Sequence, residues 1–281
     1  MKEILTQIKP SSEEKKEVNK LFQKYKSLIK IPKTKVILGG SSAKGTFLKG
    51  NHDIDIYVKF DKKTYSKKNL SEILAKYIKT ASKVHGSRDY FQISEKNYTI
   101  EIIPILDIKN VNFAENITDI SPFHTKFVLK NKKYIDDIML VKAFAKANGF
   151  YGAESYIQGF SGYSLEILTI YYKGFKNLIK NVSNWKELTI IDSLKAHKGR
   201  VKLNQSKMIS PIILIDPVQS SRNVTAAVSK EKYNIFIDSA KEYQKKPNKS
   251  FFITKEFSLN EIVKKGNLIL TEIIPLEGKK D

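Results

Sequence analysis

Two aspartates separated by a single residue are the first candidates for chemistry. Asp53 and Asp55 lie in the segment 53–60, which alternates polar and apolar residues in the period-two pattern of a strand. Side chains two positions apart on a strand share one face, so both carboxylates point the same way. Two like charges held together are unfavourable unless a cation lies between them, and oxygen ligands of this kind suit Mg²⁺. The pair therefore indicates a magnesium site.

A third acid could complete this site. Glu101 lies in a second predicted strand, 99–106, where Ile100 and Ile102 flank it and point to the opposite face. If this strand is a neighbour of the first, the three carboxylates could hold two metal ions about 4 Å apart. One ion would lower the pKa of an attacking hydroxyl, and the other would neutralise a triphosphate and its leaving group.

The segment 39–46 has the composition of a phosphate-binding loop. A short predicted strand, 35–38, ends at two glycines, and the second of them, Gly40, lets the backbone turn sharply and approach a ligand closely. Ser41 then begins a helical turn whose backbone amides suit a phosphate, and Lys44 adds a positive charge on the same side.

Taken one at a time, these features have ordinary explanations. An aspartate pair on an edge strand is commonly a solvated face, a Gly-Gly-Ser sequence is commonly a turn, and Glu101 alone could be an exposed strand residue. Their order and spacing together are much more specific, and they favour a site for metal ions and a triphosphate.

The composition limits the partners and the compartment. The 281 residues include 50 Lys and Arg against 29 Asp and Glu, a formal net charge of +21. Such a charge favours a polyanionic partner, nucleic acid before an anionic membrane, although solubility or a lysine-rich genome would also explain it. The absence of cysteine excludes disulfides and thiolate metal sites. The first ten residues lack a signal-peptide core, and no apolar run approaches the roughly 20 residues of a membrane span, so we expect no membrane and a cytoplasmic protein.

The elements that must position these residues fall into two parts. The first third is typical of a small mixed sheet with helices, beginning with a helix that starts at a capping box, Ser11 to Glu14, and ends at Pro32. Further elements of this part are expected at 35–38, 53–60, 70–78, 90–94 and 99–106. The rest is mainly helical, with helices expected at 136–148, 163–179 and 233–243 and short strands near 251–257 and 268–274. The sequence therefore predicts an α+β fold with a catalytic domain at 1–116, a helical domain at 117–250 and a short strand segment at 251–281.

The run from Gly40-Ser41 to Asp53-x-Asp55 resembles the signature of the nucleotidyltransferases of the DNA polymerase β superfamily. A wider match is similar to the archaeal-type tRNA CCA-adding enzymes, and it covers roughly 21–252. Four further segments carry this resemblance in the order of the family: 121–125, 141–154, 159–163 and 216–224. The resemblance implies a polymerase β-like N-terminal sheet followed by a helical domain that binds the nucleotide and RNA.

The resemblance also implies an activity, the addition of C, C and A to the 3′ end of tRNA from CTP and ATP, with release of pyrophosphate and with two Mg²⁺ ions. Asp53 and Asp55 match the residues that bind both metal ions. Glu101 stands where the family usually has Asp, and its side chain is one methylene longer. It matches the third carboxylate, which assists the 3′-hydroxyl of the acceptor, so we expect Glu101 to share the catalytic and metal-binding role.

Seven residues match nucleotide-binding positions of the family: Gly40, Ser41, Lys44, His124, Lys142, Tyr151 and Arg222. The first two hold the triphosphate, and Lys44 stands where an Arg is common, which keeps the charge but loses bidentate geometry. The next three surround the triphosphate and its sugar, and Arg222 matches the arginine that contacts the base edge of C and A. Without the resemblance, the histidine, the second lysine and the tyrosine would be ordinary part-buried or packing residues, and Arg222 could cap a neighbouring element.

The sequence leaves several alternatives open. The enzyme could stop after adding CC, add only A, or make oligo(A) or poly(A). Its acceptor could instead be a small molecule. A non-catalytic relative could also bind RNA without transferring a nucleotide. Family members usually continue into a tail domain that grips the tRNA elbow, whereas this sequence ends shortly after the predicted helical domain. We therefore expect a naturally minimal enzyme, a truncated chain or a tail on a separate chain, with the basic surface holding the acceptor stem. The oligomeric state stays open.

Overall fold

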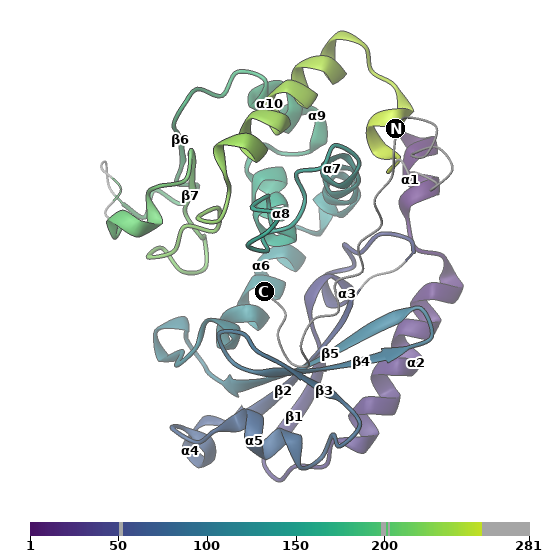
Figure 1. Ribbon diagram of the computed structural model, residues 1–281, viewed down its shortest axis with the longest axis vertical. Helices are drawn as coiled ribbons and strands as arrows, with labels where there is room; N and C mark the ends of the chain where they lie inside the picture. Colours follow the sequence, from purple (N-terminus) through teal and green to yellow (C-terminus); the bar gives the residue numbers. More distant parts are fainter. Residues whose placement is uncertain (51–52, 198–200, 202, 255–281) are drawn as a thin grey trace, which may run out of the picture.

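The computed structural model describes residues 1–50, 53–197, 201 and 203–254, which form a sheet region and a helical region stacked along the long axis (Figure 1). The strands of the sheet region are Thr34–Leu38 (β1), Asp53–Asp61 (β2), Ser82–Val84 (β3), Tyr90–Glu95 (β4) and Tyr98–Asp107 (β5). Their order in the sheet is β1-β2-β5-β4-β3.

The central pair of the sheet, β2 and β5, is parallel, whereas the other pairs are antiparallel. In this register Asp55 lies opposite Glu101, and Ile54 lies opposite Ile100. Both isoleucines are fully buried. Since neighbouring residues of a strand point to opposite faces, burial of the isoleucines on one face leaves the two acids on the other. The strand of Glu101 is therefore a neighbour of the aspartate strand, which is the condition for the three carboxylates to share one face.

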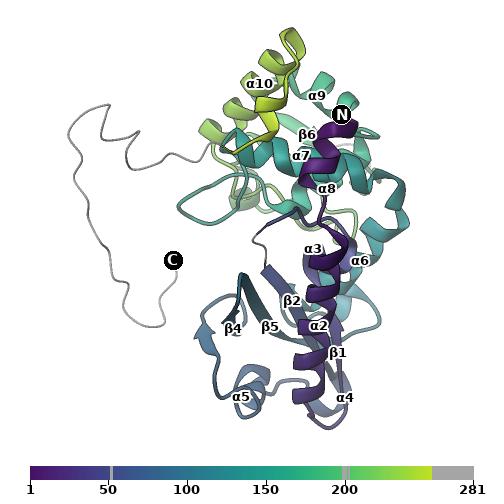
Figure 2. The ribbon, with the colours of Figure 1, turned by 90° about the vertical axis from the view of Figure 1, so that its right-hand side faces the viewer.

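The long helix α2, Ser12–Leu28, runs along the sheet and covers its apolar face (Figure 2). Val18 and Leu21 are buried in the same hydrophobic core as Ile54. The predicted capping box is confirmed, because the Glu14 amide donates to Ser11 Oγ at 3.1 Å and the Ser11 amide donates to Glu14 Oε2 at 2.7 Å. The short helices of this region are Gly40–Lys44 (α3), Lys62–Tyr65 (α4), Leu70–Ala75 (α5), Val111–Phe113 (η1) and Ile117–Ile120 (η2).

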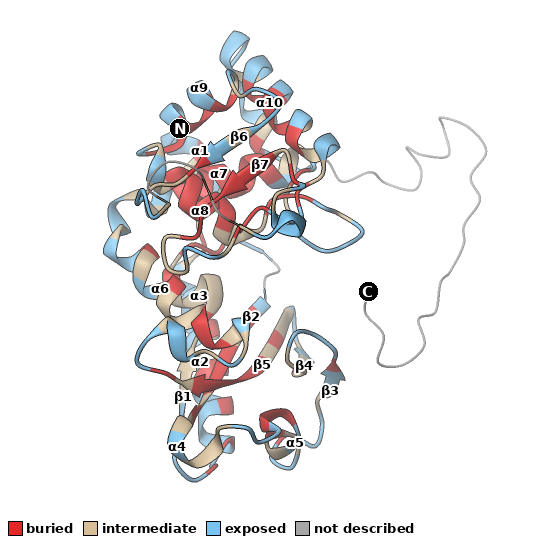
Figure 3. Cartoon of the chain, turned by 90° about the vertical axis from the view of Figure 1, so that its left-hand side faces the viewer, coloured by how far each residue is buried: buried red, intermediate tan, exposed pale blue. Residues whose placement is uncertain are grey.

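The helical region is built around two buried helices, α7 and α8 (Figure 3). Its helices are Ser121–Lys130 (α6), Ile135–Ala147 (α7), Gly162–Tyr171 (α8), Phe175–Val182 (α9) and Lys230–Lys245 (α10), with 3-10 turns Lys132–Tyr134 (η3), Gln205–Lys207 (η4) and Lys249–Phe252 (η5). Two short parallel strands, Thr189–Ile191 (β6) and Ile212–Leu214 (β7), complete the region. In the described part of the chain no helix is long and apolar enough to cross a membrane.

The chain starts in the helical region, although the sheet follows next in the sequence. Helix α1, Lys2–Ile8, lies beside α7 at the N-terminus (Figures 1 and 2). Ile4 is buried in the core that contains Phe144 of α7. The sequence did not predict this helix, because seven residues with few apolar positions carry little periodic signal.

Two predicted elements differ in the structure. The helix expected at 163–179 is two helices, α8 and α9, and the break occurs at Gly174, where φ is +114° and the Phe175 amide donates to Asp137 Oδ1 at 2.9 Å. The strand expected from Phe251 begins instead as the turn η5, since the ring of Phe251 stacks on Phe144 at 5.9 Å. The remainder of that strand from 255 on, and the strand expected at 268–274, lie outside the described residues.

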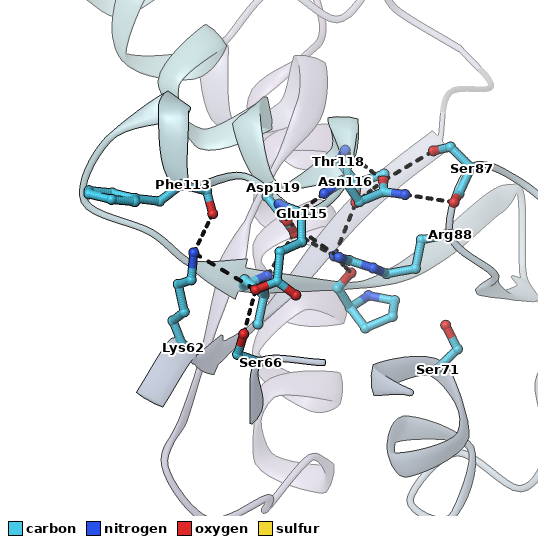
Figure 4. A network of polar contacts seen from close by, with 12 residues as sticks. Lys62, Ser66, Ser71, Ser87, Arg88, Phe113, Glu115, Asn116, Thr118 and Asp119 are labelled. Atoms are coloured by element: carbon cyan, nitrogen blue, oxygen red, sulfur yellow. Dashed lines mark hydrogen bonds and ion pairs between the residues drawn. The ribbon is translucent and has the colours of Figure 1, made fainter. Parts of the chain in front are cut away.

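A polar network fixes the junction between the two regions (Figure 4). The fully buried carboxylate of Asp119 accepts hydrogen bonds from the backbone amides of Leu106 at 2.8 Å, Glu115 at 3.0 Å and Asn116 at 3.0 Å. The guanidinium of Arg88 also contacts this carboxylate. Asp119 therefore holds the end of β5 to the turn at 115–116 that precedes η2.

Candidate active site

A cavity of about 680 Å³ is lined by residues of both regions. The sheet region contributes Ser41, Lys44, Thr46, Asp53, Asp55 and Glu101, and the helical region contributes Lys142, Lys146, Tyr151, Tyr163 and Glu166. Acids and lysines from segments far apart in the sequence therefore meet in one space. This arrangement suits a ligand that carries both metal ions and phosphate groups.

The three predicted carboxylates lie on the wall formed by the sheet. Asp55 and Glu101 are opposite each other on paired strands, and Asp53 precedes Asp55 by two residues on the same face. Glu101 Oε1 accepts a hydrogen bond from Gln92 Nε2 at 3.1 Å. Burial raises the pKa of Asp55 to about 6, and the charge of Asp53 adds to this effect while Lys44 opposes it. A carboxylate in such surroundings is stabilised by a nearby cation.

The donor set fits a hard divalent cation in its chemistry. All three groups are carboxylates on one cavity wall, which are the ligands that Mg²⁺ prefers. Among the described residues, no three such side chains lie close enough together to hold a metal ion.

The predicted phosphate loop turns against the aspartate strand. The Gly39 amide donates to the Asp55 carbonyl at 2.7 Å. Gly40 has φ of +50°, and a Cβ atom there would lie 1.7 Å from Asp55 Oδ2. No side chain fits in that space, so Gly40 must be glycine for the loop to pass the carboxylate. The helix α3 begins here and ends at Gly45 in the left-handed conformation.

The two predicted phosphate-binding lysines share one buried carboxylate. Glu166 of α8 is 1% exposed. Its Oε2 accepts from Lys44 Nζ at 2.8 Å, and its Oε1 accepts from Lys142 Nζ at 2.7 Å and from Thr46 Oγ1 at 2.7 Å. Burial raises the pKa of Glu166, but Lys142 and Lys44 outweigh it and hold this pKa at about 2. The cluster therefore carries one net positive charge beside the three acids of the sheet.

A second buried carboxylate joins the remaining predicted residues. Asp216 Oδ2 accepts from Arg222 Nη1 at 3.3 Å and lies 3.1 Å from His124 Nε2. Its Oδ1 accepts from the Tyr163 hydroxyl at 3.0 Å and from the Val218 amide at 2.8 Å. The imidazole of His124 stacks on the Tyr163 ring with centroids 4.0 Å apart. Burial lowers the pKa of His124, while Asp216 acts in the opposite direction.

The structure brings most of the predicted residues into the cavity. The residues that line it are Ser41, Lys44, Asp53, Asp55, Glu101, Lys142 and Tyr151, and Gly40 lies directly against Asp55. His124 and Arg222 are absent from this lining and belong to the Asp216 cluster, which reaches the cavity through Tyr163.

Sequence analysis missed Glu166 and gave Asp216 no role of its own. For Glu166 a signal was present, because it is an acid between Leu165 and Ile167 in a helix with mainly apolar residues. A charge buried among apolar side chains requires partners of opposite charge. Which lysines supply those partners could not be read from the sequence.

Two family models match the chain in succession. The nucleotidyltransferase domain matches residues 18–135, and the second domain of tRNA nucleotidyltransferases matches residues 136–253. The fold is also that of a nucleotidyltransferase. The structure of a cytoplasmic RNA terminal U-transferase superposes with a TM-score of 0.70 over 91% of this chain and 97% of the other, at 14% sequence identity. The predicted polymerase β-like α+β fold is confirmed.

Curated relatives are closer in sequence. The CCA-adding enzyme of Nanoarchaeum equitans is 44% identical over 234 residues, which are 78% of this chain and 59% of that protein. The CCA-adding enzyme of Methanococcus maripaludis is 33% identical over 99% of this chain and 67% of its own length. This chain thus spans about three fifths of the length of the first relative. With both family models in order and this identity along nearly the whole sequence, the chain belongs to the family of archaeal CCA-adding tRNA nucleotidyltransferases.

Proposed function

We propose that this chain adds C, C and A to the 3′ end of tRNA from CTP and ATP and releases pyrophosphate. The observation that carries the proposal is the cavity, which three carboxylates and two lysines line together beside the loop at Gly40. The oxygen of the acceptor 3′-hydroxyl would form a bond to the α-phosphorus as the bond to pyrophosphate breaks. Positioning and electrostatic stabilisation would supply most of the catalysis.

We assign the metal-binding role to Asp53, Asp55 and Glu101, with two Mg²⁺ ions as the proposed cofactors. When bound, the ions would lower the pKa of the attacking hydroxyl and neutralise the leaving pyrophosphate. Glu101 supports this role by its register, since it lies directly opposite Asp55 on the parallel strand. The Gln92 amide bonded to Oε1 would orient the longer side chain toward the cavity.

The triphosphate would bind beside the carboxylates, between the loop that begins at Gly40 and the lysines of the cavity. The amides at Gly40 and Ser41 begin a helix beside Asp55, and Lys44 follows one turn later. Lys142 reaches the same place from α7, and Glu166 keeps both ammonium groups near each other. We propose that these residues orient the triphosphate, and that Tyr151 contacts the same nucleotide from the helical side.

We propose that Arg222 contacts the base edge of C and A. Its guanidinium is held by Asp216, which also orients His124 and Tyr163. The hydrogen bond from Arg222 Nη1 to Asp216 Oδ2 would orient the guanidinium toward the base.

The partner would be the acceptor end of tRNA, which the net charge of +21 would attract through its phosphates. We also retain the proposed division of the chain near Asn116, where the Asp119 network joins sheet and helices. A cytoplasmic location remains part of this proposal.

The test is incorporation of labelled CTP and ATP onto tRNA that lacks its CCA end, read at single-nucleotide resolution with Mg²⁺. We expect two C and one A to be added, after which the reaction stops, and no incorporation by Asp53→Asn. Runs of A, or a stop after CC, would assign the same chemistry to another branch of the superfamily. No transfer to tRNA or to small acceptors would contradict the proposed activity.

A further inference from the structure

The face of the sheet that carries the acids becomes apolar beyond Asp55. Tyr57 follows Asp55 by two residues on β2, so both side chains lie on one face. Tyr57 is opposite Ile103 of β5 and Ile37 of β1, and these three side chains pack together. Only 7% of Tyr57 is exposed. A tyrosine buried to this extent usually has a partner for its hydroxyl.

The ring of Tyr57 lies directly against the phosphate loop. A Cβ atom at Gly39 would lie 2.4 Å from Cε2 and 2.7 Å from Cζ of this ring. Gly39 has φ of −122°, which other residue types also adopt, so the ring, and not the backbone conformation, excludes a side chain here. The Gly39 amide also donates to the Asp55 carbonyl at 2.7 Å. The loop therefore contacts the aspartate strand through its backbone and through the Tyr57 ring.

The Tyr57 hydroxyl joins this loop to the helical region. Its hydrogen-bonding partners are the Gly40 backbone and the Ser121 side chain. Gly40 is the first residue of α3, and Ser121 is the first residue of α6. These two helices also pack against each other. One buried group thus links the phosphate loop to the first helix of the other region.

The loop requires support from outside because its own residues provide little. Gly40 has φ of +50° and no side chain, and glycine has more backbone freedom than any other residue. Ordering a free loop around a ligand costs conformational entropy and weakens binding. Contacts that fix Gly39 and Gly40 before a ligand arrives reduce this cost.

We propose that Tyr57 is a positioning residue that holds the loop at Gly39 and Gly40 in the geometry that binds the triphosphate. Tyr57 is absent from the lining of the cavity, so it acts through the loop and not by touching the ligand. The proposal rests on the proposed function for the identity of that ligand.

The experiment removes the hydroxyl and keeps the ring, with Tyr57→Phe in the full chain. Tyr65→Phe is the matched control, because the Tyr65 hydroxyl donates to the Pro32 carbonyl at 2.8 Å in the same region but outside the cavity lining. Binding of CTP is measured with Mg²⁺ and without RNA, and urea denaturation confirms that each variant is folded under these conditions.

We expect Tyr57→Phe to weaken CTP binding by about fivefold, as for the loss of one hydrogen bond, and Tyr65→Phe to bind as the wild type does. In nucleotide transfer, the KM for CTP should rise by the same factor while kcat is retained. Ser121→Ala removes the other partner and should have a similar effect. The double variant should bind no more weakly than either single variant, because both changes break one connection.

Equal CTP affinities for wild type, Tyr57→Phe and Ser121→Ala would overturn the proposal. Losses that add in the double variant would show that the two residues act separately, and would overturn the link between the loop and α6. A wild-type chain that binds no CTP would overturn it as well. Because binding is measured without turnover, a chain that binds CTP but transfers no nucleotide would refute the proposed function and leave this inference standing.

Discussion

Glu166 and Asp119 are both buried carboxylates, and their partners differ in kind. Asp119 is 0% exposed and accepts from three backbone amides as well as contacting Arg88. Glu166 is 1% exposed, and its partners are two lysine side chains and a threonine hydroxyl. Backbone amides cannot move to another anion without unfolding, whereas lysine side chains can rotate toward one. The two carboxylates are equally buried, but their effects differ. Asp119 stabilises the junction between the two regions, whereas Glu166 leaves two lysines within reach of a ligand.

The largest effect on stability is expected at the junction. Asp119→Ala removes the acceptor of three buried amides and leaves Arg88 without its carboxylate, so it should lower the free energy of unfolding by about 4 kcal/mol. Urea denaturation measures this loss, with Glu115→Gln at the nearby exposed ion pair as the control. The folded fraction of Asp119→Ala should bind CTP normally. Weak CTP binding by correctly folded Asp119→Ala would show that Asp119, like Glu166, also affects ligand binding.

Glu166→Gln should affect both stability and ligand binding. Two buried lysines lose their shared counter-charge, which should cost about 3 kcal/mol of unfolding free energy. The KM for CTP should rise by about tenfold, since repulsion separates the two ammonium groups.

The matched double variant, Glu166→Gln with Lys142→Met, separates these two effects. It removes one charge of each sign, so stability should recover in part while the KM for CTP stays high. Recovery of both quantities would contradict the proposed role of Lys142 in orienting the triphosphate.

The loss of unfolding free energy at acid pH should also depend on Glu166. Its pKa is about 2 in the folded protein and near 4.5 when unfolded, so its contribution is complete above pH 4.5 and is lost as pH falls toward 2. The difference in unfolding free energy between wild type and Glu166→Gln should therefore shrink by about 2–3 kcal/mol across that window. Denaturation curves between pH 2 and 6 measure it. A difference that stays constant with pH would show that the buried pair does not control the charge of Glu166.

The smallest of these effects on stability is expected at the phosphate loop. Gly40→Ala would place a Cβ atom against the Asp55 carboxylate, which should cost about 2 kcal/mol and strongly reduce nucleotide transfer. Gly45→Ala is the matched control, because Gly45 also has positive φ, at +69°, but no atom lies within 4 Å of its added Cβ. Gly45→Ala should lose about 1 kcal/mol and keep its activity. Equal activities of the two variants would argue against a close approach of the loop to the carboxylate.

Local patterns in the sequence predicted the main elements of the sheet region, although the short strand β3 and the short helix α4 were not predicted. The alternation at 53–60 and 99–106 predicted β2 and β5, and the capping box predicted the start of α2. These patterns work because side-chain direction repeats every two residues in a strand and helix ends leave amides to be capped. The helical region was less predictable. The break at Gly174 depends on the hydrogen bond from the Phe175 amide to Asp137, which lies 38 residues before Phe175, and the turn at 249–252 depends on packing against α7.

The sequence by itself determined which chemical groups this protein carries and that Asp53 and Asp55 share one face of a strand. Only the tertiary structure decided the partners of the buried charges. Glu166 meets a lysine 122 residues away, and Asp216 meets His124 across 92 residues. No local period encodes such pairs, because their energy depends on the water excluded when two distant segments pack together.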